Sequence, residues 1–194
     1  MSYDSKYIVL DTEHGGFDDN DEPLSLLEAG FAIYDHKWER QDGLLLKVMP
    51  DNGIFQVTGE AMAVNKIDLI KHAQDAAPYK DVKSTLYEFL EHHSEGGKVK
   101  LTPVGHHVSG DIKIVCRDLL AKRSWNAKVS YRVLDTGSTA QYLRARGILP
   151  HTEKGSLISL CKYYNIPVVG AHTSMGDVEM TAKLMQRFST MEIK

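Results

Sequence analysis

Three short apolar runs separated by short turns open this chain, and they restrict its fold more than any other feature. The runs cover residues 6–10, 29–34 and 44–49, and the turns lie around residues 36–43 and 50–53. Strands joined by such short turns favour an antiparallel meander. Helical periodicity begins only after Thr58, so we expect the chain to start with a sheet.

The rest of the chain alternates between helical and extended patterns. After Thr58, a single buried helix face is predicted by the spacing of Met62, Val64, Ile67 and Ile70. Further helices are predicted over residues 80–93, 111–122, 138–146, 156–164 and 174–188, and extended segments over residues 98–108 and 129–134. The helix over residues 80–93 should carry an apolar stripe of Val82, Leu86 and Leu90, and that over residues 111–122 an apolar face of Ile112, Val115, Cys116 and Leu119. This order predicts one α/β domain over residues 1–194, built on a mixed sheet flanked by helices.

The composition is that of an ordinary globular protein, with 42% hydrophobic and 25% charged residues. No apolar run approaches the roughly 18 residues of a membrane span. The first residues lack the basic region and apolar run of a secretory signal. Cys116 and Cys161 lie among apolar residues, and two buried thiols in a reducing compartment are the simplest account of them. We therefore expect a cytoplasmic protein with no membrane partner.

Charge is distributed unevenly along the chain, although the formal net charge is only −3. Residues 1–30 are rich in acids, whereas residues 113–154 are rich in lysine and arginine. An acidic pocket beside a basic wall could guide a phosphate backbone toward bound metal ions. For most of these basic residues, a solvated helix face is the favoured interpretation.

Asp11 and Glu13 follow the first apolar run. Residues two apart in a strand lie on the same face, so both carboxylates should project from one side at the end of a central strand. Gly15 and Gly16 would let a substrate approach the backbone there. Taken alone, however, an Asp-x-Glu pattern fits a solvated strand end better than a functional site.

Two more acids and a histidine stand at predicted helix starts. Asp111 follows the turn at residues 107–110, and Asp177 closes the segment SMGD, which matches a capping box. Taken singly, both acids are explained as helix caps. His172 lies in the loop before the last helix, where it could accept a proton near neutral pH. Clustered carboxylates repel one another unless cations hold them, so the whole set suggests metal-assisted attack of water on a phosphodiester.

These motifs together resemble those of the DEDDh 3′–5′ exonucleases, a family that includes proofreading subunits of DNA polymerases, RNase T and oligoribonuclease. Asp11-Thr12-Glu13 resembles the first motif of the family, residues 105–111 (GHHVSGD) the second, and residues 172–177 (HTSMGD) the third. The strand end at residues 133–136 is also similar to a recurrent family segment. A chance match at one motif is easy, but three in order are not.

The resemblance implies an RNase H-like fold whose first three strands are antiparallel and whose later strands are parallel. It implies a metal-dependent hydrolase that removes nucleoside 5′-monophosphates from the 3′ ends of single-stranded nucleic acid, with DNA favoured. Asp11, Glu13, Asp111 and Asp177 would hold two divalent cations, Mg²⁺ or Mn²⁺. His172 would be the general base that deprotonates the attacking water.

Three positions depart from the family pattern. His14 stands where threonine is frequent, His107 replaces the usual asparagine, and Gly110 replaces a bulky residue before Asp111. These changes affect substrate contacts rather than the expected metal ligands. The candidate substrate-binding residues are Thr12, His14, Phe17 and His107. Phe17 could stack on the terminal base or pack back on the sheet.

Other functions stay open at this stage. An exoribonuclease like RNase T or oligoribonuclease would use the same motifs, because sugar discrimination depends on contacts to the 2′-hydroxyl. A non-catalytic nucleic-acid-binding module is disfavoured, since all five catalytic positions are filled. Association as a homodimer or with a polymerase is left open.

Overall fold

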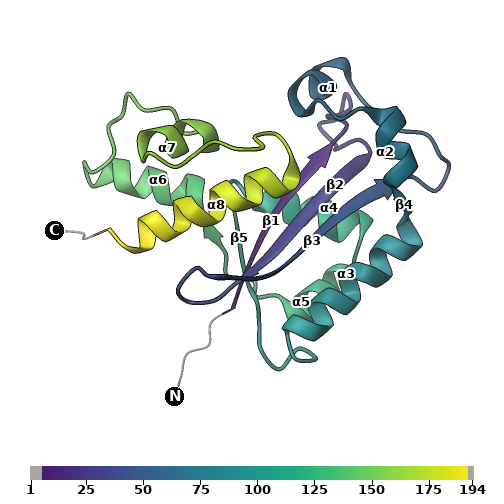
Figure 1. The fold of residues 1–194 in the computed structure, drawn as a ribbon, viewed down its shortest axis with the longest axis horizontal. Coiled ribbons are helices and arrows are strands. Elements are labelled where there is room, and N and C mark those ends of the chain that lie inside the picture. The colour runs from purple at the N-terminus through teal and green to yellow at the C-terminus, as the bar shows by residue number, and fades with distance from the viewer. Residues whose placement is uncertain (1–5, 192–194) are drawn as a thin grey trace.

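A computed structural model describes residues 6–191 of the chain and shows one six-stranded mixed sheet (Figure 1). The strand order is β4-β3-β2-β1-β5-β6. Neighbours pair antiparallel from β1 to β3 and parallel elsewhere, as predicted. The strands are β1 (Tyr7–His14), β2 (Leu26–Tyr34), β3 (Arg40–Met49), β4 (Ala77–Pro78), β5 (Thr102–Gly105) and β6 (Leu134–Asp135).

Eight helices of the described residues surround this sheet. In Figure 1, α6, α7 and α8 lie on one face of the sheet, α3, α4 and α5 on the other, and α1 and α2 near the end toward which β1 runs. Their bounds are α1 (Gly59–Asn65), α2 (Leu69–Asp75), α3 (Tyr79–His93), α4 (Ser109–Asp118), α5 (Lys122–Lys128), α6 (Thr136–Ala145), α7 (Leu157–Tyr163) and α8 (Ser174–Ser189). None of the helices within residues 6–191 combines the length and the apolar character that a membrane span requires.

Each face of the sheet has its own apolar core because side chains alternate along a strand. In β1, Ile8 and Leu10 join the core under α3, α4 and α5, with Trp125 of α5 buried beside them. Val9, between them, joins the core under α6, α7 and α8. The sheet is therefore covered on both sides, and functional side chains can gather only at its ends or rims.

The first predicted strand was too short. β1 pairs with β2 as far as His14, so Asp11 and Glu13 lie within the strand rather than beyond its end. The apolar run ends at Leu10, but the backbone ladder continues, because β2 supplies partners for polar residues as readily as for apolar ones.

Two predicted strands were too long. The segment predicted over residues 98–108 forms a strand only in β5, and that over residues 129–134 only in β6, apart from one isolated bridge between Leu101 and Val129. Tyr131, within the second segment, is 80% exposed. Apolar composition predicted strands here, but the neighbouring strand offers partners over only a few residues.

The single buried helix face predicted after Thr58 was wrong. The chain forms two short helices, α1 and α2, separated at Lys66, whose φ is +57°. Asn65 Oδ1 accepts a hydrogen bond from the Ile67 backbone N–H, and Asp68 caps α2. These local polar contacts interrupt the helical period. Val64 and Ile70 are consequently 53% and 77% exposed.

The helix predicted over residues 111–122 was misplaced. It begins earlier, as α4, and ends at Asp118; a separate helix that was not predicted, α5, follows. Of its predicted face, Val115 and Leu119 are buried, whereas Ile112 and Cys116 are only partly buried. The other predicted helices correspond to α3, α6, α7 and α8 with small shifts at their ends.

Candidate active site

Three of the predicted acidic residues meet where β1 passes the first turn of α8. Asp11, Glu13 and Asp177 each offer a carboxylate oxygen, and these oxygens all lie within 4.8 Å of one another. Asp11 and Glu13 share one face of β1, as predicted. Asp177 reaches them because Gly30, opposite Asp11 on β2, leaves room for α8. A Cβ at position 30 would lie 2.9 Å from the Ser174 carbonyl carbon.

Asp111 approaches β1 from α4, on the other side of the sheet. Its Oδ1 accepts hydrogen bonds from the Thr12 backbone N–H (3.0 Å) and the Thr12 hydroxyl (2.7 Å). The carboxylate is therefore fixed to the residue between Asp11 and Glu13. The alternative interpretation of Asp111 as a helix cap was wrong, because α4 begins after Val108 without a side-chain cap.

Asp135, at the end of β6, orders the turn that leads to Asp111. One carboxylate oxygen accepts from the Val108 N–H at 2.9 Å, and the other accepts from the Ser138 N–H at 2.7 Å. These hydrogen bonds lower the pKa of Asp135 in spite of its burial. Asp135 thus stabilises the starts of α4 and α6 together.

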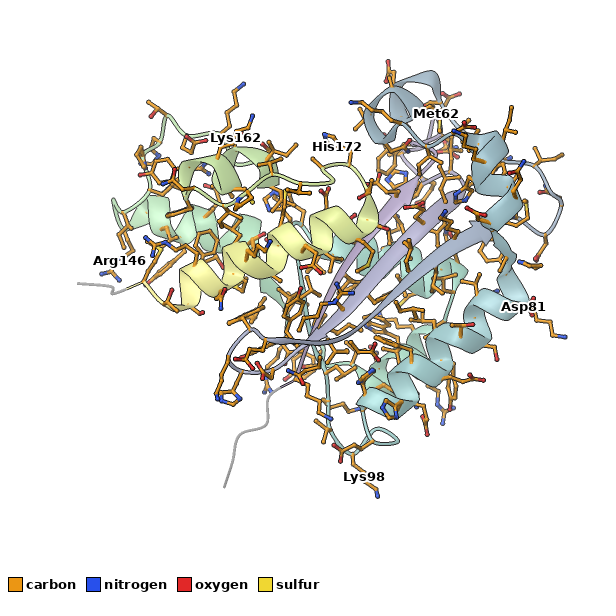
Figure 2. All side chains as sticks on the ribbon, in the orientation of Figure 1. Met62, Asp81, Lys98, Arg146, Lys162 and His172 are labelled. Carbon is orange, nitrogen blue, oxygen red and sulfur yellow. The ribbon has the colours of Figure 1, made fainter. Side chains whose placement is uncertain are left out.

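His172 and Asp177 lie on the two sides of the start of α8. The capping box predicted at residues 174–177 was wrong, since Thr173 is the N-cap and its hydroxyl accepts from the Gly176 N–H. Asp177 instead accepts from the His172 backbone N–H at 3.2 Å. Figure 2 shows His172 on the loop entering α8, near the end of the sheet toward which β1 runs. This hydrogen bond therefore holds the loop that carries His172 close to Asp177.

The carboxylate cluster, defined as Asp11, Glu13, Asp111 and Asp177, is electrostatically unfavourable without a counter-charge. Burial raises the pKa of Asp11 well above its ordinary value, and the other three carboxylates raise it further. Burial and nearby acids, Asp177 first, raise the pKa of Glu13 to about 7. Burial also raises the pKa values of Asp111 and Asp177, against opposing hydrogen bonds from Thr12 and His172. An all-oxygen set of this kind fits hard divalent cations such as Mg²⁺ or Mn²⁺.

Two pockets flank the cluster and share the side chains of Thr12, His14 and Phe17. The first pocket, of about 400 Å³, reaches Glu13 and is lined on one side by residues of α1. The second pocket, of about 230 Å³, reaches Asp111 and is lined by His107 and residues of α4. All four predicted substrate-binding residues therefore line at least one pocket.

Phe17 does not pack back on the sheet. It is 54% exposed, and its ring meets the edge of His14 with 4.7 Å between ring centroids. His14 in turn contacts the backbone of Gly16 through Nδ1. The aromatic surface of Phe17 is thus held in place and available to both pockets.

Gly15 and Gly16 have a packing role that the sequence did not predict. A Cβ at Gly15 would lie 2.1 Å from the Gln56 carbonyl oxygen, and one at Gly16 would lie 2.6 Å from the Thr58 hydroxyl. Both glycines are therefore needed for close packing against residues 56–58, and Gly16 also lines the first pocket.

The sequence motifs did not identify the wall of the first pocket that comes from α1 and the turn before it. Its side chains include Thr58, Ala61, Val64 and Asn65. Val64 was assigned to a buried face, whereas it is an exposed apolar residue beside the pocket. No local signal marks this wall, since it arises from the placement of α1 beside β1.

Several of the basic residues of the 113–154 segment bind protein groups. Arg117 binds Asp118 and the backbone carbonyls of Pro23 and Leu24. Lys128 is buried and binds Glu91. These contacts favour a structural role for both cations over a basic wall for nucleic acid.

The sequence matches no protein-family model and no curated protein. Its structure is similar to E. coli exonuclease I in complex with a dT13 oligonucleotide, with a TM-score of 0.73 and 17% identity over 96% of this chain and 41% of that chain. This chain thus spans about 41% of the length of exonuclease I.

Two further similar structures cover most of their own chains. One is a 3′-exonuclease in a structure of 3′-end-specific recognition of a histone mRNA stem-loop, with a TM-score of 0.69 and 14% identity over 97% of this chain and 83% of that chain. The other is the nuclease domain of 3′hExo, a DEDDh family member, bound to rAMP, with a TM-score of 0.68 and 14% identity over 97% of this chain and 93% of that chain. The chain has the RNase H-like fold of these exonucleases, which confirms the predicted fold class.

Proposed function

We propose that this chain, which has the fold of the DEDDh exonucleases, is itself a metal-dependent 3′–5′ exonuclease acting on single-stranded nucleic acid, with DNA as the favoured substrate. The observation that carries the proposal is the convergence of Asp11, Glu13 and Asp177 within 4.8 Å. Asp111 is tied to the same strand through Thr12. Acids from three distant segments meet at one point, which isolated strand ends and helix caps do not explain.

The carboxylate cluster would hold two divalent cations, with Mg²⁺ and Mn²⁺ as the candidates. The fit rests on its donor chemistry: four carboxylates supply only oxygen donors, and burial raises the pKa of each of them. When bound, such ions activate water and stabilise the charge that develops on the phosphate.

His172 is the proposed general base. Its backbone N–H is bound to Asp177, so its loop is anchored at the edge of the cluster. A ring nitrogen of His172 would take the proton of the attacking water. Hydrolysis of the terminal phosphodiester would release a nucleoside 5′-monophosphate and leave a new 3′-hydroxyl.

The first pocket is the proposed site of the terminal nucleoside. Phe17 and Val64 present exposed apolar surface from opposite elements of this pocket. Thr12 and Asn65 are polar residues of the same pocket wall. An aromatic surface stacks on any base, which suits an exonuclease that must accept successive nucleotides regardless of sequence.

RNA is the alternative substrate. One similar structure concerns a histone mRNA stem-loop and another holds rAMP, whereas exonuclease I holds a DNA oligonucleotide. An exoribonuclease like RNase T or oligoribonuclease would use the same cluster and differ in its contacts to the 2′-hydroxyl.

Parallel digestion of labelled substrates tests the proposal. The substrates are single-stranded DNA, mismatched duplex DNA, single-stranded RNA and a dinucleotide, each with Mg²⁺, with Mn²⁺ and with chelator. We expect nucleoside 5′-monophosphates to be released from 3′ ends, fastest from single-stranded DNA, and no release in chelator.

Variants separate this activity from a contaminant. Asp11→Ala should abolish release, whereas Asp81→Asn should not; Figure 2 shows Asp81 on α3, well away from His172. Activity that survives chelator, or that is unchanged in Asp11→Ala, would exclude the proposed mechanism. Faster cleavage of RNA than of DNA would select the alternative substrate.

A further inference from the structure

The second pocket adjoins the first, since Thr12, His14 and Phe17 line both, but its remaining wall comes from His107 and α4 where that of the first comes from α1. It reaches Asp111, as the first pocket reaches Glu13. A phosphodiester has one nucleoside on each side. A phosphate held at the cluster would therefore direct one nucleoside to each pocket.

The walls of the second pocket suit an uncharged aromatic group better than a phosphate. Phe17 and His107 supply ring surfaces. The one ammonium group on its wall, from Lys113, is already paired with Glu22, with Nζ 3.1 Å from each carboxylate oxygen. Asp111 adds negative charge. A nucleobase is the part of a nucleic acid that matches this chemistry.

Gly110 leaves the α4 side of the second pocket open. It lies in the first turn of α4, and a Cβ built on it would meet no heavy atom within 4 Å. The His107 ring, which also lines this pocket, is fixed in place, since it packs so closely against Gly137 that a Cβ at position 137 would lie 2.6 Å from the ring. The opening is therefore a fixed feature of the pocket.

We propose that the second pocket receives the nucleobase on the 5′ side of the scissile phosphate, and that Gly110 leaves room for a base enlarged by an extra substituent. The inference rests on the proposed exonuclease function and extends it to 3′ ends that carry modified bases. Gly110 is then a determinant of substrate range, set by the absence of a side chain.

The test compares two oligodeoxynucleotides that differ only in the penultimate base, which is adenine or ethenoadenine, an adenine with a fused extra ring. The wild-type protein should release the terminal nucleotide from both at similar rates. Gly110→Phe should lower kcat/KM for the ethenoadenine substrate by about tenfold or more relative to the adenine substrate, because a filled pocket rejects added bulk. The ratio of kcat/KM for the two substrates in Gly110→Ala should lie between those of the wild type and Gly110→Phe.

Ser109→Phe is the matched control, since it adds the same bulk at a neighbouring exposed position that does not line the pocket. It should behave like the wild type. The fluorescence of ethenoadenine gives a second readout in chelator, where it should be quenched by stacking in the wild-type protein and less quenched in Gly110→Phe.

The outcomes separate the two proposals. The assignment of the second pocket is wrong if Gly110→Phe and the wild type have the same ratio of kcat/KM for the two substrates. It is also wrong if the wild type does not cleave the ethenoadenine substrate. If no protein releases nucleotides but quenching occurs and is lost in Gly110→Phe, the pocket assignment stands and the exonuclease proposal fails.

Discussion

Two histidines near the carboxylate cluster hold backbone conformations that residues other than glycine rarely adopt. φ is +64° at His172 and +62° at His107. Such conformations persist only where the surroundings fix them. Here the His172 N–H is bound to Asp177, and the His107 ring packs against Gly137. The backbone at the candidate site is thus determined by contacts between distant segments, and each histidine has a defined place.

Replacing His172 tests its role as the base. His172→Ala should lower kcat by about a hundredfold to ten-thousandfold, as expected for loss of a positioned general base. Affinity for Mn²⁺ should change little, because the imidazole is not part of the carboxylate cluster. Calorimetric titration with Mn²⁺ and single-turnover rates measure the two effects.

A control for this substitution is His151→Ala, since His151 is an exposed loop residue that lines neither pocket. It should keep both metal affinity and rate. Wild-type turnover in His172→Ala would remove His172 from the mechanism.

At the scale of single elements, sequence pattern succeeded where packing is regular. The predicted stripe of α3, with Val82, Leu86 and Leu90, is buried as expected. Pattern failed where polar side chains direct the backbone, as at Asn65 between α1 and α2. Composition alone also does not show where a neighbouring strand ends. For this reason, the strand predicted over residues 129–134 was longer than β6.

In the candidate site, too, the sequence predicted the arrangement within one strand but not the contacts between elements. The sharing of one strand face by Asp11 and Glu13 follows from the period of a strand. The approach of Asp111 to Thr12 and the wall formed by Val64 do not, because they depend on how α4 and α1 pack on β1. Local motifs identified the acids that meet in the carboxylate cluster, whereas the pockets around them depend on tertiary packing.

The close packing of α8 on β2 leads to a prediction for Gly30. Gly30→Ala should push the first turn of α8, and with it Asp177, away from Asp11, because the new Cβ would overlap the Ser174 backbone. We expect the free energy of unfolding to fall by about 1–3 kcal/mol, as for other overpacked sites. Affinity for Mn²⁺ should fall with it.

Denaturant unfolding and Mn²⁺ titration measure these effects. Gly59→Ala is the control, since a Cβ there meets nothing within 4 Å. Normal Mn²⁺ binding by Gly30→Ala would show that α8 does not need this contact to place Asp177.

The double role of Asp135 leads to a second prediction at this scale. Asp135→Ala removes the acceptor for both the Val108 and Ser138 N–H groups. Loss of a helix cap costs about 0.5–2 kcal/mol, and we expect a value at the upper end because two helices are affected. Turnover should fall as well, since the turn carrying His107 and Asp111 loses its anchor.

Asp68→Ala is the comparison, because Asp68 caps α2 with two similar hydrogen bonds. It should cost comparable stability and leave turnover much closer to wild type. Equal losses of turnover in Asp68→Ala and Asp135→Ala would mean that Asp135 acts only through general stability.

Across the whole molecule, folding brings like charges together. β1, α4 and α8 are far apart in sequence, and their acids converge only when both apolar cores are formed. Packing on the two faces of the sheet therefore offsets the repulsion among these carboxylates, which are far apart in the unfolded chain. The stability of the entire fold should report the charge state of the cluster.

The pH dependence of stability follows from the raised pKa of Glu13. The folded protein holds a proton there up to about pH 7, whereas the unfolded chain releases it near the ordinary value of 4.5. Since the folded state binds more protons between these values, the free energy of unfolding contributed by this group falls as pH rises through that window. The raised pKa values of Asp11, Asp111 and Asp177 act in the same direction.

We therefore expect the Tm of the metal-free protein to fall between about pH 5 and about pH 8, and Glu13→Gln to reduce that fall, because it removes one of the titrating groups. Asp81→Asn should keep the wild-type slope. Mn²⁺ at a hundredfold excess over its Kd should add about 2.7 kcal/mol at the higher pH. Thermal unfolding across pH, with and without Mn²⁺, measures all three effects. Equal slopes for Glu13→Gln and the wild type would show that the pKa of Glu13 is not raised by burial and by nearby acids in the folded protein, and the argument for cations at this site would lose its support from Glu13.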